Sequence, residues 1–241
     1  MLAKGITTSL IVLGCCLGCT GDRPKKLITL DSIQAHQDSL INPIQYLLFG
    51  SSTPSTIDTD SFSTNEYHLL KEGDIILRRG FGNISDLIAD FLDEEYTVTH
   101  AGLLVKPINK PAEVWHTSAT EDHNGTIAQP LKVYCKNSQA GSLIVVRLKN
   151  NLHAPALSLQ KAQQLMLQNR PFDFHFDHYS DDKLYCLEFL RNCYLDAYQY
   201  DYFPKKKTAQ GIEVLHMDNF FNSNNFDCII NHYDSSLIIQ D

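Results

Sequence analysis

Residues 181–189 read DDKLYCLEF and place one cysteine, Cys186, in the first turns of a predicted helix. Asp181 or Asp182 can cap this helix. Its apolar positions repeat at three and four residues along one face: Leu184, Leu187, Leu190 and Tyr194. Backbone N–H groups at a helix N-terminus lower the pKa of a thiol, and the thiolate is the nucleophilic form of cysteine. The alternative is an ordinary buried cysteine of the core, and helix position alone favours neither interpretation.

Two histidines precede this cysteine in predicted strands. His100 opens the apolar run 100–105, in which small residues follow it and leave room for a substrate, so it suits a general base that faces a cleft. His116 lies in the next strand, where alternation puts Val114 and His116 on one face and Trp115 on the other. A polar third residue of this kind would orient the imidazole of the base. A lone histidine is more often structural, so the order of the three residues carries the argument.

Three segments in this order resemble the circularly permuted branch of the NlpC-type papain-like peptidases, the YiiX/YebB-like group. They are 72–76 (EGDII), 99–105 (THAGLLV) and 181–189. In that group a GDI strand opens the domain, a histidine followed by a small residue and glycine provides the base, and a YCSE-type helix start provides the nucleophile. The resemblance covers about 69–200 and includes the approach segment 170–174 (RPFDF). It implies an α+β papain-like domain, with a small antiparallel sheet or barrel packed against helices and the nucleophile at a helix N-terminus.

The resemblance implies that Cys186 is the nucleophile, His100 the base and His116 the third catalytic residue. Glu113 has the residue type that the family usually carries at the third position, but it lies three positions earlier and on the opposite face of the strand. We therefore prefer the histidine. Position 187 is leucine where the family commonly has serine, which leaves the nucleophile in place but removes a hydroxyl. Three residues are expected to bind substrate: Tyr185, Glu188 and Glu113.

The activity implied by this resemblance is hydrolysis of an amide bond, in peptides of cell-wall type, through a thioester and without a metal or organic cofactor. Two alternatives stay open. The lecithin retinol acyltransferase group is similar in using two histidines on consecutive strands and a cysteine on a later helix, which would make this chain a thiol acyltransferase or phospholipase acting on a lipid acyl substrate. The other alternative is a non-catalytic surface lipoprotein that binds peptide in a degenerate cleft, which the leucine at 187 allows.

Composition excludes some classes of partner and site. The net charge is -8, with 28 acidic against 20 basic residues, so no electrostatic footprint for nucleic acid exists. Among the four cysteines beyond residue 19 no CxxC pair occurs, and no histidine pair flanks them at ligand spacing, so no cysteine zinc site and no other metal is expected. A disulfide remains open among the four cysteines beyond residue 19: Cys135, Cys186, Cys193 and Cys228.

The N-terminus has the order of an export signal: Lys4, an apolar stretch at 6–13, then small residues and cysteines at 14–19. It resembles a bacterial lipobox, so we expect an exported protein anchored to a cell membrane by a lipid on Cys19 or, in a second frame, Cys15. An uncleaved apolar tail with incidental cysteines is the alternative. The expected organisation is a signal peptide at 1–19, a tether and N-terminal arm at 20–68 with a short helix at about 31–49, and the hydrolase domain at 69–241.

Short apolar runs predict four strands, at 75–77, 100–105, 113–117 and 143–148. A helix capped by Asn83 or Ser85 should run through Phe91, and another should cover 158–168. The stretch 122–125 is expected to be a turn. The acidic and aromatic tail after Tyr198 either covers the cleft or packs beneath it.

Overall fold

The computed structural model describes residues 59–120, 122–149, 154–174, 176, 182–208, 211 and 213–233. All of them belong to one compact unit, 42–241. The predicted signal peptide, both candidate lipidation cysteines and the predicted helix of the tether lie outside the described residues. Among the helices described, none combines the length and the apolar character that crossing a membrane requires.

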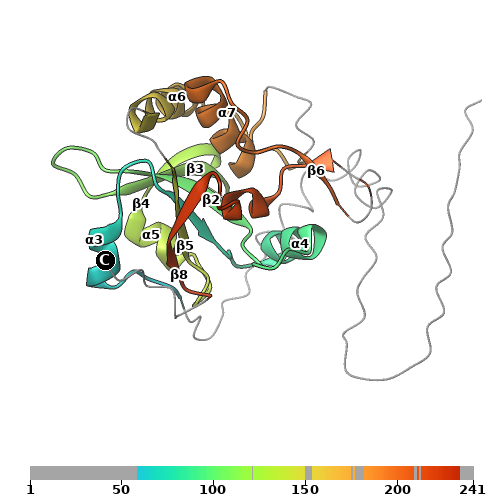
Figure 1. The fold of residues 1–241 in the computed structure, drawn as a ribbon, viewed down its shortest axis with the longest axis horizontal. Helices are drawn as coiled ribbons and strands as arrows, with labels where there is room; N and C mark the ends of the chain where they lie inside the picture. The colour runs from blue at the N-terminus through green and yellow to red at the C-terminus, as the bar shows by residue number, and fades with distance from the viewer. Residues whose placement is uncertain are drawn as a thin grey trace, which may run out of the picture. The chain divides into compact units, whose positions relative to one another are not determined.

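A six-stranded antiparallel sheet forms the centre of this unit, with the strand order β4-β3-β2-β1-β5-β8 (Figure 1). Its strands are β1 Ile75–Arg78, β2 His100–Val105, β3 Glu113–Ala119, β4 Asn124–Pro130, β5 Ile144–Leu148 and β8 Phe226–Asn231. A second, small sheet pairs β6 Lys206–Lys207 with β7 Glu213–Val214. The first four strands of the large sheet follow one another in the chain, whereas β5 returns beside β1 and the C-terminal tail supplies β8 at the edge.

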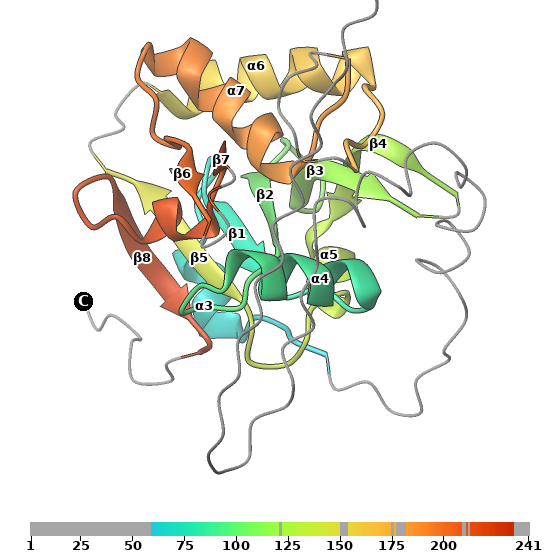
Figure 2. The ribbon, with the colours of Figure 1, turned by 90° about the vertical axis from the view of Figure 1, so that its right-hand side faces the viewer.

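Different helices cover the two faces of the sheet (Figure 2). They are α3 Thr64–Leu69, α4 Asn83–Leu92, α5 Leu131–Lys136, α6 Ala154–Gln168, α7 Cys186–Tyr198 and the 3-10 helix η1 Met217–Phe221. Helix α7 contacts β2 and β3, with α6 beside it, while α5 contacts β3 and β4. In β1, Ile75 and Leu77 join the core of α7, and Ile76 joins the core of α5. A strand buried on both faces requires a continuous apolar run, as β1 has. The predicted α+β class, with an antiparallel sheet packed against helices, is confirmed.

A buried ion pair joins the start of β1 to β5. The carboxylate of Asp74 has no exposed surface and accepts hydrogen bonds from Nε and Nη2 of Arg147 at 2.6 and 2.8 Å. The same carboxylate accepts from the backbone N–H of Lys71 at 2.7 Å. The backbone carbonyl of Asp74 accepts from Leu104 at 2.8 Å. The aspartate of the GDI segment therefore ties β1 to both neighbouring strands.

The tail after Tyr198 packs into the core. Phe203, Phe220 and Phe226 are all buried and contact one another, with ring centroids 5.1 to 6.0 Å apart. Phe203 also packs against Tyr194 of α7, at 5.8 Å between centroids. Of the two alternatives for this tail, packing beneath the helix is the one observed. At the other end, the last residues of the predicted arm pack on the unit too, because the side chain of Asp60 accepts from the backbone N–H groups of Ser142 and Leu143, both at 2.9 Å.

Helix α7 begins later than predicted. Tyr185 is its N-cap and the cysteine is its first residue, so Asp182 does not cap it, and Asp181 lies outside the described residues. Leu184 was expected on the apolar helix face, but it precedes the helix. Its N–H donates to the carbonyl of Pro171 at 2.9 Å, which holds it in an extended bridge beside the approach segment. The helix cannot start until this bridge ends.

The remaining differences concern short elements and helix starts. All four predicted strands are present, and the third extends to Ala119. The cap of α4 is Gly82, with φ 89°, so neither Asn83 nor Ser85 caps it. Helix α6 begins at Ala154 rather than at 158. The sequence does not predict β4, β8, α3 or α5, and part of the expected turn at 122–125 belongs to β4.

Candidate active site

Cys186 is the first residue of α7, and 4% of its surface is exposed. Burial raises the pKa of its thiol to about 11, while the backbone N–H groups of Ala101, Leu187 and Cys186 itself act to lower it. Because the backbone N–H of Ala101 acts to lower the pKa of the thiol, the sulfur must lie close to Ala101 in β2, the residue that follows His100. The helix N-terminus thus stabilises the thiolate, as the sequence predicts. Burial nevertheless outweighs this effect, so the resting group is a neutral thiol.

The two predicted histidines lie together. Nε2 of His100 is 2.9 Å from Nδ1 of His116. The rings are nearly perpendicular, with centroids 4.8 Å apart and an interplanar angle of 84°. They come from adjacent strands, because β2 and β3 pair in a register that sets Leu103 opposite Trp115. This antiparallel register brings the two imidazoles onto the same face of the sheet.

Gly102 makes the close approach of these strands possible. A Cβ atom at this position would lie 2.4 Å from Cγ1 of Val114 and 3.2 Å from Cβ of His116. No side chain fits there without moving β3. The glycine of the THAG segment is therefore required by packing, and it sets the separation of the histidine pair.

An aromatic ring and a cation complete the surroundings of the pair. The ring of Tyr134, from α5, lies 5.8 Å from that of His100 and 5.1 Å from that of His116, and its hydroxyl donates to the carbonyl of Ile76 at 3.0 Å. The guanidinium of Arg78 lies over the Tyr134 ring, 4.5 Å from its centroid. The sequence carries no local signal for either residue, because they reach the pair from separate parts of the chain.

Both imidazoles are neutral in this setting. Burial lowers the pKa of His100 well below its usual value, and the charges of Arg78 and His116 add to the effect. Burial also lowers the pKa of His116 to about 3, with Arg78 again adding, while the carbonyl of Thr117 and the side chain of Gln129 partly offset this. The resting site therefore holds a thiol and two uncharged imidazoles.

The contacts of His116 decide which nitrogen of His100 can serve as the base. Nδ1 of His116 lies 2.9 Å from both Nε2 of His100 and the carbonyl of Thr117. A neutral imidazole nitrogen cannot donate to the carbonyl and accept from the other ring at once, so the two contacts belong to different tautomers. In the tautomer in which Nε2 of His100 donates to Nδ1 of His116, Nδ1 of His100 is the nitrogen that can take a proton from a thiol. Among the described residues no hydrogen bond joins His100 to Cys186, whose sulfur lies near the backbone N–H of the next residue in β2, Ala101.

The three residues expected to bind substrate have different positions. Tyr185 is 3% exposed and packs its ring on Phe176, with 5.2 Å between centroids. Glu188 accepts a hydrogen bond from the backbone N–H of Tyr185 at 3.1 Å, so it caps α7. Glu113 accepts from Nε1 of Trp115 at 3.1 Å and pairs with Val105, at the end of β2 opposite to the base. The structure brings Tyr185 and Glu188 to the nucleophile and keeps Glu113 away from the histidine pair.

A separate group of side chains has the types and spacing of metal ligands, although the sequence predicts none. Glu94, His216 and Asp218 each offer one ligand atom, and these atoms lie within 4.8 Å of one another. The signal in the sequence is slight, because only the pair His216 and Asp218 is local. The segment that carries them lies near the nucleophile helix, since the backbone N–H of Leu215 approaches the buried hydroxyl of Tyr185, although not with hydrogen-bond geometry.

Comparisons with known proteins bear on the fold and on the class of enzyme. No match was found among curated proteins. A crystal structure of the metalloprotein YiiX from Escherichia coli O157:H7 is similar, with a TM-score of 0.57 and 20% identity over 68% of this chain and 98% of that chain, which supports the fold. Residues 69–229, more than half of the 241, match the family described as permuted papain-like amidase enzymes, YaeF/YiiX, C92. The chain belongs to this family of papain-like cysteine peptidases and amidases, and it is a hydrolase of that class.

Proposed function

We propose that this hydrolase cleaves an amide bond in peptides of cell-wall type, with Cys186 as nucleophile, His100 as base and His116 as the residue that orients the base. The observation that carries the proposal is the 2.9 Å contact between Nε2 of His100 and Nδ1 of His116. It fixes the ring of the base and leaves its Nδ1 for the thiol. Family membership supports hydrolysis at the level of the class, and the choice of peptide rests on the same resemblance.

In the first half of the reaction the sulfur of Cys186 attacks the carbonyl carbon of the amide while its proton passes to Nδ1 of His100. The C–N bond then breaks, and the imidazolium returns the proton to the leaving amine. An acyl thioester remains on the sulfur. Because burial keeps both groups neutral before attack, proton transfer and attack are coupled, in contrast to a preformed thiolate and imidazolium pair.

In the second half a water molecule attacks the thioester carbonyl, and His100 removes its proton. The C–S bond breaks, the acid is released and the thiol of Cys186 takes the proton back. Both tetrahedral intermediates carry an oxyanion. The first backbone N–H groups of α7, including that of Cys186, have no partner within the helix and can donate to it.

Lipid acyl transfer is the second candidate, and the histidine at 116 favours it because the lecithin retinol acyltransferase group uses two histidines on consecutive strands, whereas the third position of the amidase family is usually a glutamate or another polar residue. A thioester formed from a lipid donor would then pass its acyl chain to an acceptor amine. Incubation with a radiolabelled lipid and then with peptide fragments separates the two: label on Cys186 without peptide cleavage supports acyl transfer. Membership of an enzyme family argues against the third alternative, a non-catalytic binding lipoprotein.

We also propose export and lipid anchoring at Cys19 or Cys15. The support is the order of charge, apolar stretch and small residues over 4–19. Labelled fatty acid fed to expressing bacteria should enter the wild-type protein. It should be lost from Cys19→Ala if that frame is used, and from Cys15→Ala if the other is. Incorporation into neither protein, including the wild type, would contradict anchoring.

The decisive test of hydrolysis is turnover of purified muropeptide fragments, followed by mass spectrometry. Cys186→Ala should abolish cleavage and leave the melting temperature of the protein nearly unchanged. Cys228→Ala is the matched control, because Cys228 is half-buried in β8, outside the histidine pair, and its loss should leave turnover intact. Equal turnover by Cys186→Ala and the wild type would end the proposal.

A further inference from the structure

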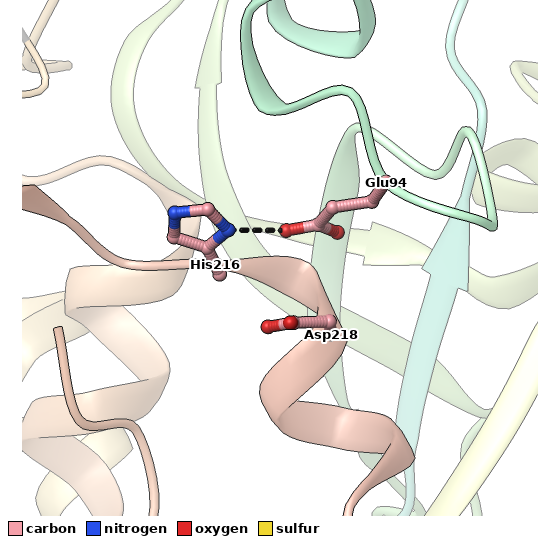
Figure 3. A group of neighbouring side chains, drawn as sticks. All are labelled: Glu94, His216 and Asp218. Atoms are coloured by element: carbon pink, nitrogen blue, oxygen red, sulfur yellow. Dashed lines mark ion pairs between the residues drawn. The ribbon is translucent and has the colours of Figure 1, made fainter. Parts of the chain in front are cut away.

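We propose that Glu94, His216 and Asp218 bind a divalent first-row transition-metal ion of the Zn²⁺ class, which ties the segment before β2 to the C-terminal segment. Figure 3 shows the three side chains pointing toward one another, with His216 and Glu94 in contact and Asp218 beside them on η1. The inference is independent of the hydrolytic mechanism, which uses none of these residues.

The contact between His216 and Glu94 is the first observation. Nδ1 of His216 lies 2.9 Å from Oε1 of Glu94, and the two side chains are 9% and 8% exposed. The pair is close, but its geometry is not that of a hydrogen bond. A nitrogen and an oxygen that face each other at this distance outside hydrogen-bond geometry are placed to bind one ion together.

The second observation is the number of buried polar atoms without a hydrogen-bond partner. Neither carboxylate oxygen of Glu94, both of them buried, has a partner with hydrogen-bond geometry among the described residues, although the backbone N–H groups of Met217 and Asp218 approach the carboxylate. Buried polar groups normally have partners, and leaving a carboxylate without them is costly. A cation that binds the carboxylate and the imidazole at once would compensate this cost.

The third observation is the match of distances to a metal. Zn²⁺ binds histidine nitrogen and carboxylate oxygen at about 2.0 to 2.2 Å, so two ligand atoms of a tetrahedral site are about 3.4 Å apart. The 2.9 Å contact must open by about 0.5 Å to reach this separation. Asp218 lies within 4.8 Å of the other ligand atoms, and its side chain is 43% exposed, so it can rotate inward. Water can then complete the coordination from the open side.

Charge favours a cation here. Two carboxylates converge on one point, and Oδ1 of Asp218 is paired at 2.7 Å with Nζ of Lys206, which leaves its other oxygen for a ligand role. One nitrogen and two carboxylates favour Zn²⁺ over Mg²⁺ or Ca²⁺, which prefer oxygen alone.

The position of this group gives the ion a structural role. Glu94 lies in the segment between α4 and His100, the first residue of β2. His216 follows Leu215, whose backbone N–H lies near the hydroxyl of Tyr185, the N-cap of the nucleophile helix, without a hydrogen bond between them. A metal ion bound by Glu94 and His216 would fix the segment that precedes the base relative to the segment that lies near the N-cap of the nucleophile helix.

The test measures metal binding and does not depend on turnover. The full chain, without a polyhistidine tag and with Cys186→Ala to remove the reactive thiol, is stripped with chelator and titrated with Zn²⁺ by calorimetry. The parent should bind one more Zn²⁺ per chain than His216→Ala. Asp218→Asn, a half-exposed conservative change, should bind at least about tenfold more weakly. All variants keep the same cysteines, so metal bound to thiols cancels in the comparison.

His232→Gln is the matched control. His232 also lies between two carboxylates, Asp60 and Glu66, but both of its ring nitrogens have hydrogen-bond partners, at 2.8 and 2.9 Å. Its removal should leave the number of bound Zn²⁺ ions unchanged. Saturating Zn²⁺ should also raise the melting temperature of the parent but not of Asp218→Asn. Equal binding by the parent and Asp218→Asn, or loss of the same ion in His232→Gln, would overturn the proposal.

Discussion

His100 directs its Nε2 at Nδ1 of His116 across 2.9 Å, with the two rings nearly perpendicular. This contact gives the two ring nitrogens of His100 different roles. One nitrogen is held by the neighbouring strand, and the other remains for proton transfer. The geometry makes His116 a positioning residue, which can be separated by experiment from the groups that touch substrate.

Replacement of His116 should lower kcat while KM changes little, because the residue orients the base and makes no contact with substrate in the mechanism above. His116→Ala should lose about 10²-fold or more in kcat on a muropeptide substrate. His116→Gln should recover part of that loss, since its amide oxygen can accept from Nε2 of His100. Glu113→Gln is the control and should retain nearly full kcat. A larger loss in Glu113→Gln than in His116→Ala would make the glutamate the third residue instead.

Alkylation of Cys186 in the free enzyme should accelerate steadily with pH. Burial raises the pKa of this thiol to about 11, above its usual value, so the reactive thiolate is scarce at neutral pH and forms only as the pH approaches that value. The rate with iodoacetamide should therefore rise about tenfold per pH unit between pH 7 and 10. Mass spectrometry of the Cys186 peptide measures it. A rate that is already constant by pH 6 would show a preformed thiolate and imidazolium pair.

Gly102→Ala should destabilise the fold and reduce turnover together. The added Cβ would lie 2.4 Å from Cγ1 of Val114, so β3 must move, and overpacking of this kind costs about 1–3 kcal/mol. Urea unfolding gives the free energy. The same glycine change made in a Val114→Ala background should cost less, because the clashing methyl group is gone. Equal costs in the two backgrounds would place the strain elsewhere.

Asp74→Asn should unfold the domain more easily without touching the catalytic groups. The substitution has the shape of aspartate but leaves the guanidinium of Arg147 without its charge partner, and removing one member of a buried pair costs about 3–5 kcal/mol. Denaturant titration should show a lower midpoint. Asp86→Asn is the control, because Asp86 pairs with Arg79 while its side chain is 60% exposed, and such pairs are worth at most about 1 kcal/mol. Similar losses in both variants would contradict the role given to Asp74.

The central part of the fold can be predicted because its strands are short apolar runs that are buried on both faces. The runs at 75–77 and 100–105 contain few polar residues, and burial on both sides is what such runs require. Strand β4 escapes prediction because its sequence, NGTIAQP, has glycine and proline at its ends and little alternation. Helix α5 has six residues, too few to show a helical period.

Some residues of the candidate site can likewise be predicted from the sequence, and others cannot. Cys186, His100 and His116 can be predicted because each follows from a short local motif and their order in the chain is informative. The start of α7 cannot, because Asp182 has the residue type of a cap, while the bridge that holds Leu184 outside the helix is formed with a distant segment. Tyr134 reaches the histidines from α5, a helix that the sequence does not reveal.

The proposed metal ligands are still harder to predict from the sequence. Glu94 and His216 meet only through the tertiary fold, from a segment after α4 and from the C-terminal tail. Nothing in either local sequence distinguishes this glutamate or this histidine from the others in the chain. Only the burial of their unpartnered atoms does so.

The pairing of β8 with β5 bears on when the enzyme becomes active. The nucleophile helix lies inside the stretch of chain that this pairing closes, between Leu148 and Phe226. Contacts between residues so distant in sequence form late, because a long loop must be ordered before they contribute. Phe226 also packs in the core beneath α7. A chain in which β8 has not yet paired therefore lacks one edge of the sheet and part of the core beneath α7, so we expect full activity only after this C-terminal strand has folded into place.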